Sequence, residues 1–133
     1  MAPRLALQTD FYELTMAAGY FAAGKTRDRA TFELFARQLP PHRDFLLAAG
    51  LAQAVDYLLN LRFTPEEIDY LRRQPAFTHT SPAFFDYLAE LRFTGDLFAV
   101  PEGTPLFPAE PFLTLRGNLI ETQIAEKIGR AHV

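Results

Sequence analysis

The period of apolar and polar positions changes several times along the 133-residue chain. In several stretches apolar residues recur every three to four positions, which predicts amphipathic helices. We expect these helices at residues 11–23, 51–61, 65–73, from 82 to about 91, and from 119 onward. Three of the later starts carry capping chemistry: Thr64-Pro65-Glu66-Glu67, Ser81-Pro82 and Asn118.

Strict alternation of apolar and polar residues at 29–37 predicts a strand with one core face. Its other face would gather Arg29, Glu33, Phe35 and Arg37. Shorter apolar runs predict further strands at 45–48, expected to be buried, and at 97–100 and 112–116. The prolines between 101 and 111 leave room there only for a loop or an edge strand. Because helices and strands do not alternate regularly, the order predicts an α+β fold.

The first helix begins in the stretch Thr9-Asp10-Phe11-Tyr12-Glu13-Leu14-Thr15-Met16. Asp10 is expected to cap its N-terminus, and Glu13 stands three residues later, where a capping box needs a carboxylate. Gly24 is placed to end the helix in a left-handed conformation.

Two apolar stripes run along this helix. The first is interpreted as core and comprises Phe11, Leu14, Thr15, Ala18, Phe21 and Ala22. The second comprises Tyr12, Met16, Gly19, Tyr20 and Ala23. A small residue at the centre of the second stripe suits close approach of another surface. The alternative is that both stripes are core.

Composition excludes several classes of protein. The formal charge is −3 without a basic stripe, so we expect no nucleic-acid partner. The chain has no Cys, which excludes disulfides and thiolate metal sites. No apolar run approaches the roughly 20 residues of a membrane span, and residues 1–7 are too short for a signal peptide. We therefore expect a cytoplasmic protein that does not enter a membrane.

Residue patterns alone indicate no catalytic or metal-binding site. There is no glycine-rich phosphate loop, no metal-spaced histidine cluster and no nucleophile beside a base. His42 and His79 stand alone in proline-containing loops, and Glu102-Gly103 is interpreted as a turn. We expect no catalytic residue and no metal ligand in this chain.

The ordered set of segments nevertheless resembles the opening of nicotinate phosphoribosyltransferases. The segments that carry the resemblance are Leu7–Met16 with its Thr-Asp-x-Tyr-x-x-Thr-Met signature, Thr31–Arg37, Ala49-Gly50-Leu51, Leu61–Thr64, Pro101–Pro105 and Arg116–Gln123. The resemblance implies the N-terminal mixed helix and strand domain of a type II phosphoribosyltransferase, lacking the α/β barrel that follows in the family.

The resemblance also implies a reaction. Enzymes of this family join nicotinate to 5-phosphoribosyl 1-diphosphate in NAD biosynthesis, using ATP and Mg²⁺, and couple ATP hydrolysis through a phosphorylated histidine. That histidine and most of the phosphate site belong to the barrel, so the chain alone is expected to be inactive. Neither His42 nor His79 matches the family's histidine motif.

The substrate-binding residues implied by the resemblance are Tyr12, Asp10, Thr9 and Arg37. The signature Tyr maps onto Tyr12, which would stack on the nicotinate ring across the interface of a homodimer. Asp10 would cap its helix, orient the loop of Tyr12 or approach the nucleotide. Arg37 would either contact a phosphate of the neighbouring subunit or be a solvated residue at a strand end.

The expected boundaries are residues 1–126 for the native domain and 127–133 for a non-native tail that reads like a translated sequencing adapter. Two alternatives stay open. One is a non-catalytic α+β interaction module whose aromatic helix docks a partner. The other is the related nicotinamide or quinolinate phosphoribosyltransferase, because residues of the barrel choose between acid and amide.

Overall fold

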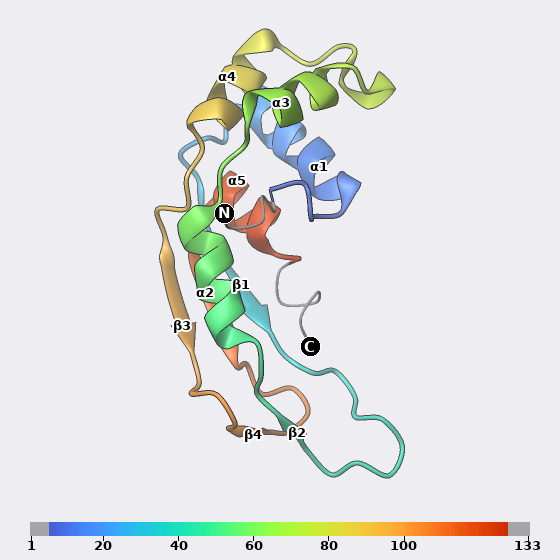
Figure 1. Cartoon of the computed structure of the whole chain (residues 1–133), viewed down its shortest axis with the longest axis vertical. Coiled ribbons are helices and arrows are strands. Elements are labelled where there is room, and N and C mark those ends of the chain that lie inside the picture. The colour runs from blue at the N-terminus through green and yellow to red at the C-terminus, as the bar shows by residue number, and fades with distance from the viewer. Residues whose placement is uncertain (1–5, 128–133) are drawn as a thin grey trace.

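The computed structural model describes residues 6–127, and these form the α+β arrangement expected from the sequence (Figure 1). The elements in chain order are α1 (Phe11–Ala22), β1 (Arg29–Leu34), β2 (Leu46–Leu47), α2 (Leu51–Asn60), α3 (Pro65–Arg72), the 3-10 turn η1 (Pro75–Phe77), α4 (Pro82–Glu90), β3 (Asp96–Ala99), β4 (Pro105–Leu106), β5 (Leu113–Asn118) and α5 (Leu119–Ala125).

The main sheet is antiparallel, with strand order β1-β5-β3. Its register places Phe32 opposite Leu115, and Leu97 on the other side of the same residue. Exposure along β1 alternates residue by residue, as the sequence pattern predicts. The strand ends at Leu34, however, so Arg37 lies in the loop beyond it.

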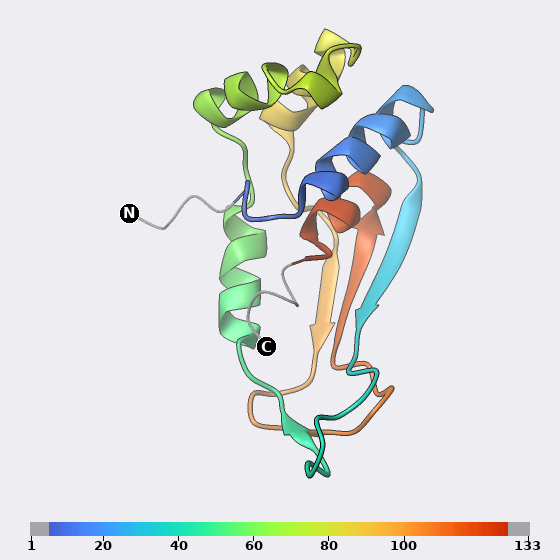
Figure 2. The same cartoon turned by 90° about the vertical axis from the view of Figure 1, so that its right-hand side faces the viewer.

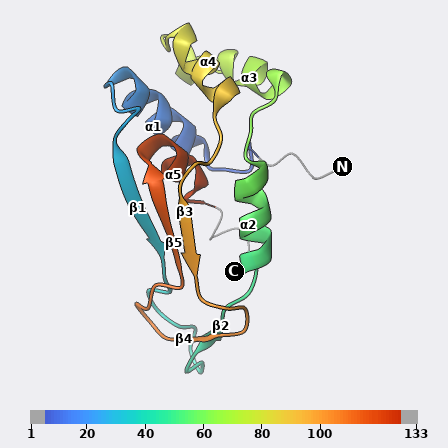
Figure 3. The same ribbon diagram turned by 90° about the vertical axis from the view of Figure 1, so that its left-hand side faces the viewer.

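Helices α1, α2 and α5 lie on one side of this sheet (Figures 2 and 3). Helix α5 follows β5 without a loop, because the Asn118 side chain accepts a hydrogen bond from the Ile120 amide at 3.0 Å and caps the helix. Helix α1 packs against α5, while α3 and α4 pair at one end of the molecule. The short β2–β4 ribbon lies at the opposite end.

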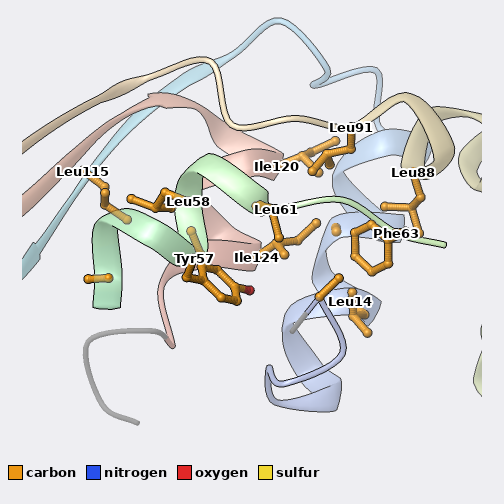
Figure 4. Packing of buried hydrophobic residues seen from close by; sticks show 14 of the residues in the cluster. Leu14, Tyr57, Leu58, Leu61, Phe63, Leu88, Leu91, Leu115, Ile120 and Ile124 are labelled. Atoms are coloured by element: carbon orange, nitrogen blue, oxygen red, sulfur yellow. The ribbon is translucent and has the colours of Figure 1, made fainter. Parts of the chain in front are cut away.

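A single apolar core joins α2, the sheet, α5, α1 and α4. Figure 4 shows Leu58 of α2 beside Leu115 of β5, and Leu61 beside Ile124 of α5. Toward α4 the core becomes aromatic, and its rings belong to Phe21, Phe77, Phe84 and Phe85. At roughly 25 cal/mol per Å² of buried apolar surface, contacts of this kind supply most of the stabilising free energy.

Two helix ends follow the sequence rules closely. Thr64 and Glu67 form the predicted capping box, in which the Glu67 carboxylate accepts from the Thr64 amide at 2.7 Å and the Thr64 hydroxyl accepts from the Glu67 amide at 3.3 Å. Gly24 ends α1 at φ +72°. The amides of Gly24 and Lys25 bond to the carbonyls of Phe21 and Tyr20, which is a Schellman motif.

A third helix is capped from far along the chain. The N-cap residue of α2 is Gly50, which has no side chain to offer. Glu102 supplies the missing acceptor, because its Oε1 accepts from the amides of Leu51 and Ala52 at 2.7 and 3.2 Å. The Glu102-Gly103 turn is therefore also an anchor for α2, a role that its sequence alone does not reveal.

The structure corrects three expectations. Asp10 makes no side-chain capping bond to α1, and Glu13 is buried against α5 instead of closing a capping box. Within the stripe interpreted as core, Phe11 is 48% exposed and Ala22 is exposed. The run 45–48 is not a buried strand, because Phe45 and Leu47 are exposed and only its two central residues form β2.

Candidate functional site

Three of the four residues proposed from the sequence meet at the end of α5. The Thr9 hydroxyl donates to the Ile124 carbonyl at 3.3 Å, and the Tyr12 hydroxyl donates to Glu126 Oε2 at 3.1 Å. Asp10 forms an ion pair with Lys127. The opening stretch of α1 is thus tied to residues more than 100 positions away.

Tyr12 has a partly exposed ring and a hydroxyl group that is fixed by a hydrogen bond. Its side chain is 44% exposed, and it lies beside exposed Phe11 and Met16 on the same helix. The Glu13 carboxyl next to the phenol, burial and the Glu126 carboxylate together raise the pKa of Tyr12 above its ordinary value. The phenol therefore stays neutral, and its ring keeps an accessible surface.

Glu13 is the unexpected member of this site. The residue is fully buried, and one carboxyl oxygen, Oε2, accepts a hydrogen bond from the Gln123 side-chain amide. Burial raises the pKa of the Glu13 carboxyl to about 7, and the Glu126 carboxyl adds to this shift, whereas the nearby Tyr12 hydroxyl and the hydrogen bond from Gln123 oppose it. Near neutral pH this carboxyl is able to gain or lose a proton.

Arg37 lies apart from the other three residues. The carbonyl of its neighbour Ala36 accepts a hydrogen bond from the Ala109 amide at 2.8 Å, which places this loop beside the chain that follows β4. Figure 2 shows the segment after β1 at the ribbon end of the sheet and α1 at the other end. Arg37 is exposed.

A cavity of about 390 Å³ opens between α1 and the segment 76–81. Gly19, at the centre of the second stripe, lines it together with small residues of α1 and with His79. The second stripe is largely exposed, except for Tyr20, whose hydroxyl donates to Gln123 Oε1 at 3.4 Å.

Residues 6–127 contain no group of three His, Asp or Glu side chains placed to hold a metal ion. His42 and His79 are both exposed in their loops. None of the helices in this range is both long and apolar enough to cross a membrane.

The sequence profile of the nicotinate phosphoribosyltransferase N-terminal domain matches residues 7–128. The chain belongs to this family. A nicotinate phosphoribosyltransferase of Mycobacterium tuberculosis is 46% identical over 121 residues, which cover 91% of this chain and 25% of the relative. The human nicotinate phosphoribosyltransferase is 40% identical and is covered over 22% of its length.

Solved structures agree with the family assignment. The crystal structure of human nicotinic acid phosphoribosyltransferase superposes with a TM-score of 0.81 at 40% identity, covering 90% of this chain and 24% of that one. A yeast structure described as a putative nicotinate phosphoribosyltransferase shares the fold at a TM-score of 0.63 and 20% identity. The chain thus spans about a quarter of the length of the relatives that it matches.

Sequence reasoning missed the carboxyl groups and the amide that meet behind Tyr12, namely Glu13, Gln123 and Glu126. The structure buries Glu13 together with Leu14 and Ala17, and neither of the two stripes predicted from the sequence contains Glu13 or Ala17. A carboxylate on a buried stripe needs a polar partner. The partner could not be read from the sequence, because Gln123 is 110 residues away.

Proposed function

We propose that this chain forms the N-terminal domain of an enzyme that converts nicotinate and 5-phosphoribosyl 1-diphosphate, with ATP, to nicotinate mononucleotide. The similarity to nicotinate phosphoribosyltransferases over residues 7–128 supports this proposal most strongly. We also propose residue 126 as the end of the native domain. Residues 128–133 of the suggested non-native tail lie outside the described residues.

Within the enzyme, we assign this domain the task of holding the pyridine ring. Tyr12 supports the assignment, because its ring is accessible while its hydroxyl is fixed by Glu126. A flat aromatic acid gains both affinity and orientation from stacking on such a ring. We infer that the ring enters the site of a second copy of the enzyme, so the active form is a homodimer.

We assign supporting roles to the remaining candidate residues. Thr9 holds the start of α1 against the end of α5, and this helps to fix the direction in which Tyr12 points. Asp10 is proposed as a substrate-binding residue beside Tyr12, without its ion pair to Lys127, because Lys127 belongs to the proposed non-native tail. The exposed guanidinium of Arg37 is suited to a phosphate or diphosphate group. Because Arg37 lies near the ribbon end of the sheet, we infer that it meets this group at a different part of the subunit interface.

ATP, Mg²⁺ and the catalytic histidine are assigned to the barrel that follows this domain in the family. Among residues 6–127, no three His, Asp or Glu side chains are placed together to hold a metal ion. With this assignment, chemistry at the ribosyl centre depends on the barrel, and the 133-residue chain by itself should show no turnover.

The proposal is tested by joining residues 1–126 to the remaining three quarters of the M. tuberculosis relative. We expect Tyr12→Ala to raise KM for nicotinate by about tenfold, since loss of a stacked ring and its buried area is worth roughly 1–2 kcal/mol. Tyr12→Phe keeps the ring and should change KM less than about threefold.

KM for 5-phosphoribosyl 1-diphosphate serves as the internal control and should stay constant in both variants. An unchanged KM for nicotinate in Tyr12→Ala would refute the role of the ring. Turnover by the unjoined chain would refute the division of labour between the two domains.

A further inference from the structure

The joint between α1 and α5 contains a buried acid with unused hydrogen-bonding capacity. Glu13 is 0% exposed, and its Oε2 accepts a hydrogen bond from Gln123. Within the described part of the chain, its Oε1 is buried without a hydrogen-bond partner. A buried polar atom of this kind is rare in folded proteins and calls for an explanation.

Titratable and polar groups reach this acid from both helices. Those that face it or lie next to it are Asp10, Tyr12 and Tyr20 of the α1 segment, and Gln123, Glu126 and Lys127 of the α5 segment. Lys127 is paired with Asp10, and Gln123 is fixed between Tyr20 and Glu13. The Glu126 carboxyl acts directly on Glu13, because it contributes to the raised pKa of that group, and it also accepts a hydrogen bond from the Tyr12 hydroxyl.

We propose that Glu13, in its neutral form, is a positioning residue for Tyr12: the Glu13 carboxylic acid donates its proton to Glu126 and holds that carboxylate where it accepts from the Tyr12 hydroxyl. This inference rests on the proposed function of the Tyr12 ring. It explains the unpartnered Oε1, since a protonated oxygen facing a carboxylate becomes a donor.

The same arrangement makes the position of Tyr12 depend on pH. When Glu13 loses its proton to solvent, two carboxylates face each other and repel. Glu126 then turns away, and the Tyr12 hydroxyl loses its acceptor. Burial and the Glu126 carboxyl raise the pKa of Glu13 to about 7, so this change falls between about pH 6 and 8.

The first test follows the intact 133-residue chain by NMR, with ¹³C label in glutamate carboxyl groups and tyrosine rings. We expect the Glu13 signal to titrate with a midpoint near 7 and the Tyr12 ring signals to shift with the same midpoint. In Glu13→Gln, which keeps the shape of the neutral acid, the Tyr12 shift should disappear and the ring should keep its low-pH signals at all pH values.

The control is Glu121→Gln, which likewise removes a buried carboxyl group, in this case one on α5. Glu121 accepts from the amide and hydroxyl of Thr94, away from Tyr12, so its replacement should leave the Tyr12 shift intact. Glu126→Gln provides a second route if Glu13→Gln does not fold, because it also removes the carboxyl pair. A Tyr12 shift that survives in either variant that folds would overturn the proposal.

The second test uses the joined enzyme described above. KM for nicotinate should rise about threefold to tenfold from pH 6 to pH 8 in the parent, whereas Glu13→Gln should remove this rise without changing kcat. If Tyr12→Ala raises KM while Glu13→Gln keeps the parental pH profile, the positioning role of Glu13 fails and the role of Tyr12 stands. If Tyr12→Ala changes nothing while the NMR shift is present, the proposed function fails instead.

Discussion

Two pairs of packed helices, α3–α4 and α1–α5, differ in the kind of side chains that they bury between them. Where α4 packs beside α3, η1 and α1, the buried part of the contact is aromatic, and Phe84 lies fully buried among the rings of Phe21, Phe77 and Phe85. Arg72 and Asp86 add an ion pair only at the exposed edge of this contact. Where α1 meets α5, the contact includes Glu13 and Gln123. The first pair gains free energy from burial, whereas the second retains polar groups that an apolar pair would not need.

This difference separates a part of the molecule that maintains the fold from a part suited to function. Ring-to-ring packing near Phe84 is insensitive to pH and holds one arrangement. The α1–α5 joint keeps a buried carboxyl with an unpartnered oxygen next to the residue proposed to hold the substrate. Buried groups with displaced pKa values are typical of functional sites, although structural networks also produce them.

The largest expected effect tests the apolar pair. Phe84→Ala should lower the free energy of unfolding by about 3–5 kcal/mol, because it leaves a cavity at a site that is 0% exposed. Phe45→Ala is the matched control, since Phe45 is 49% exposed and its loss should cost less than about 1 kcal/mol. Urea denaturation measures both. Equal costs for the two variants would mean that the aromatic cluster does not form in solution.

The sequence predicted the α3–α4 region well because its determinants are local. Thr64 and Glu67 are three residues apart, so their capping box could be recognised without knowledge of the fold. The alternation in β1 and the left-handed Gly24 are likewise properties of contiguous residues. Among the proposed site residues, Thr9, Asp10 and Tyr12 could be grouped for the same reason.

Contacts between distant segments could not be predicted in this way. Asp10 and Glu13 have the residue types and spacing of a capping box, but the Gln123 side chain draws Glu13 into the α1–α5 joint. The cap that Glu102 provides to α2 joins residues 51 positions apart. The apolar run at Phe45 and Leu47 showed β-strand character but carried no information on whether anything covers it. Local pattern shows which bonds a residue can make, and the tertiary fold selects among them.

The second prediction concerns the pH dependence of stability at the polar joint. The raised pKa of Glu13, about 7 against an ordinary 4.5, means that the folded state binds more protons than the unfolded state between these values. The stabilising contribution is complete below about pH 4.5 and is lost as pH rises through about 7. The expected loss between pH 5 and 8 is about 2 kcal/mol.

Urea titrations at pH 5, 6, 7 and 8 measure this loss as the difference between the parent and Glu13→Gln. The stability of Glu13→Gln should be flatter over this range, while Glu121→Gln should keep the parental slope. Equal slopes for the parent and Glu13→Gln would show that Glu13 has the same charge in the folded and unfolded states throughout the range.

The smallest expected change in the free energy of unfolding concerns the N-termini of α3 and α1. Thr64→Ala removes a formed capping bond and should lower the free energy of unfolding by about 1 kcal/mol. Asp10→Ala removes only a partly exposed ion pair with Lys127 and should cost less than about 0.5 kcal/mol. Denaturation at low and high salt separates the two causes, because an ion pair weakens with ionic strength and a neutral hydroxyl cap does not. A salt-independent cost for Asp10→Ala as large as that for Thr64→Ala would show that Asp10 caps α1 in solution, and that the carboxylate is not held by α5.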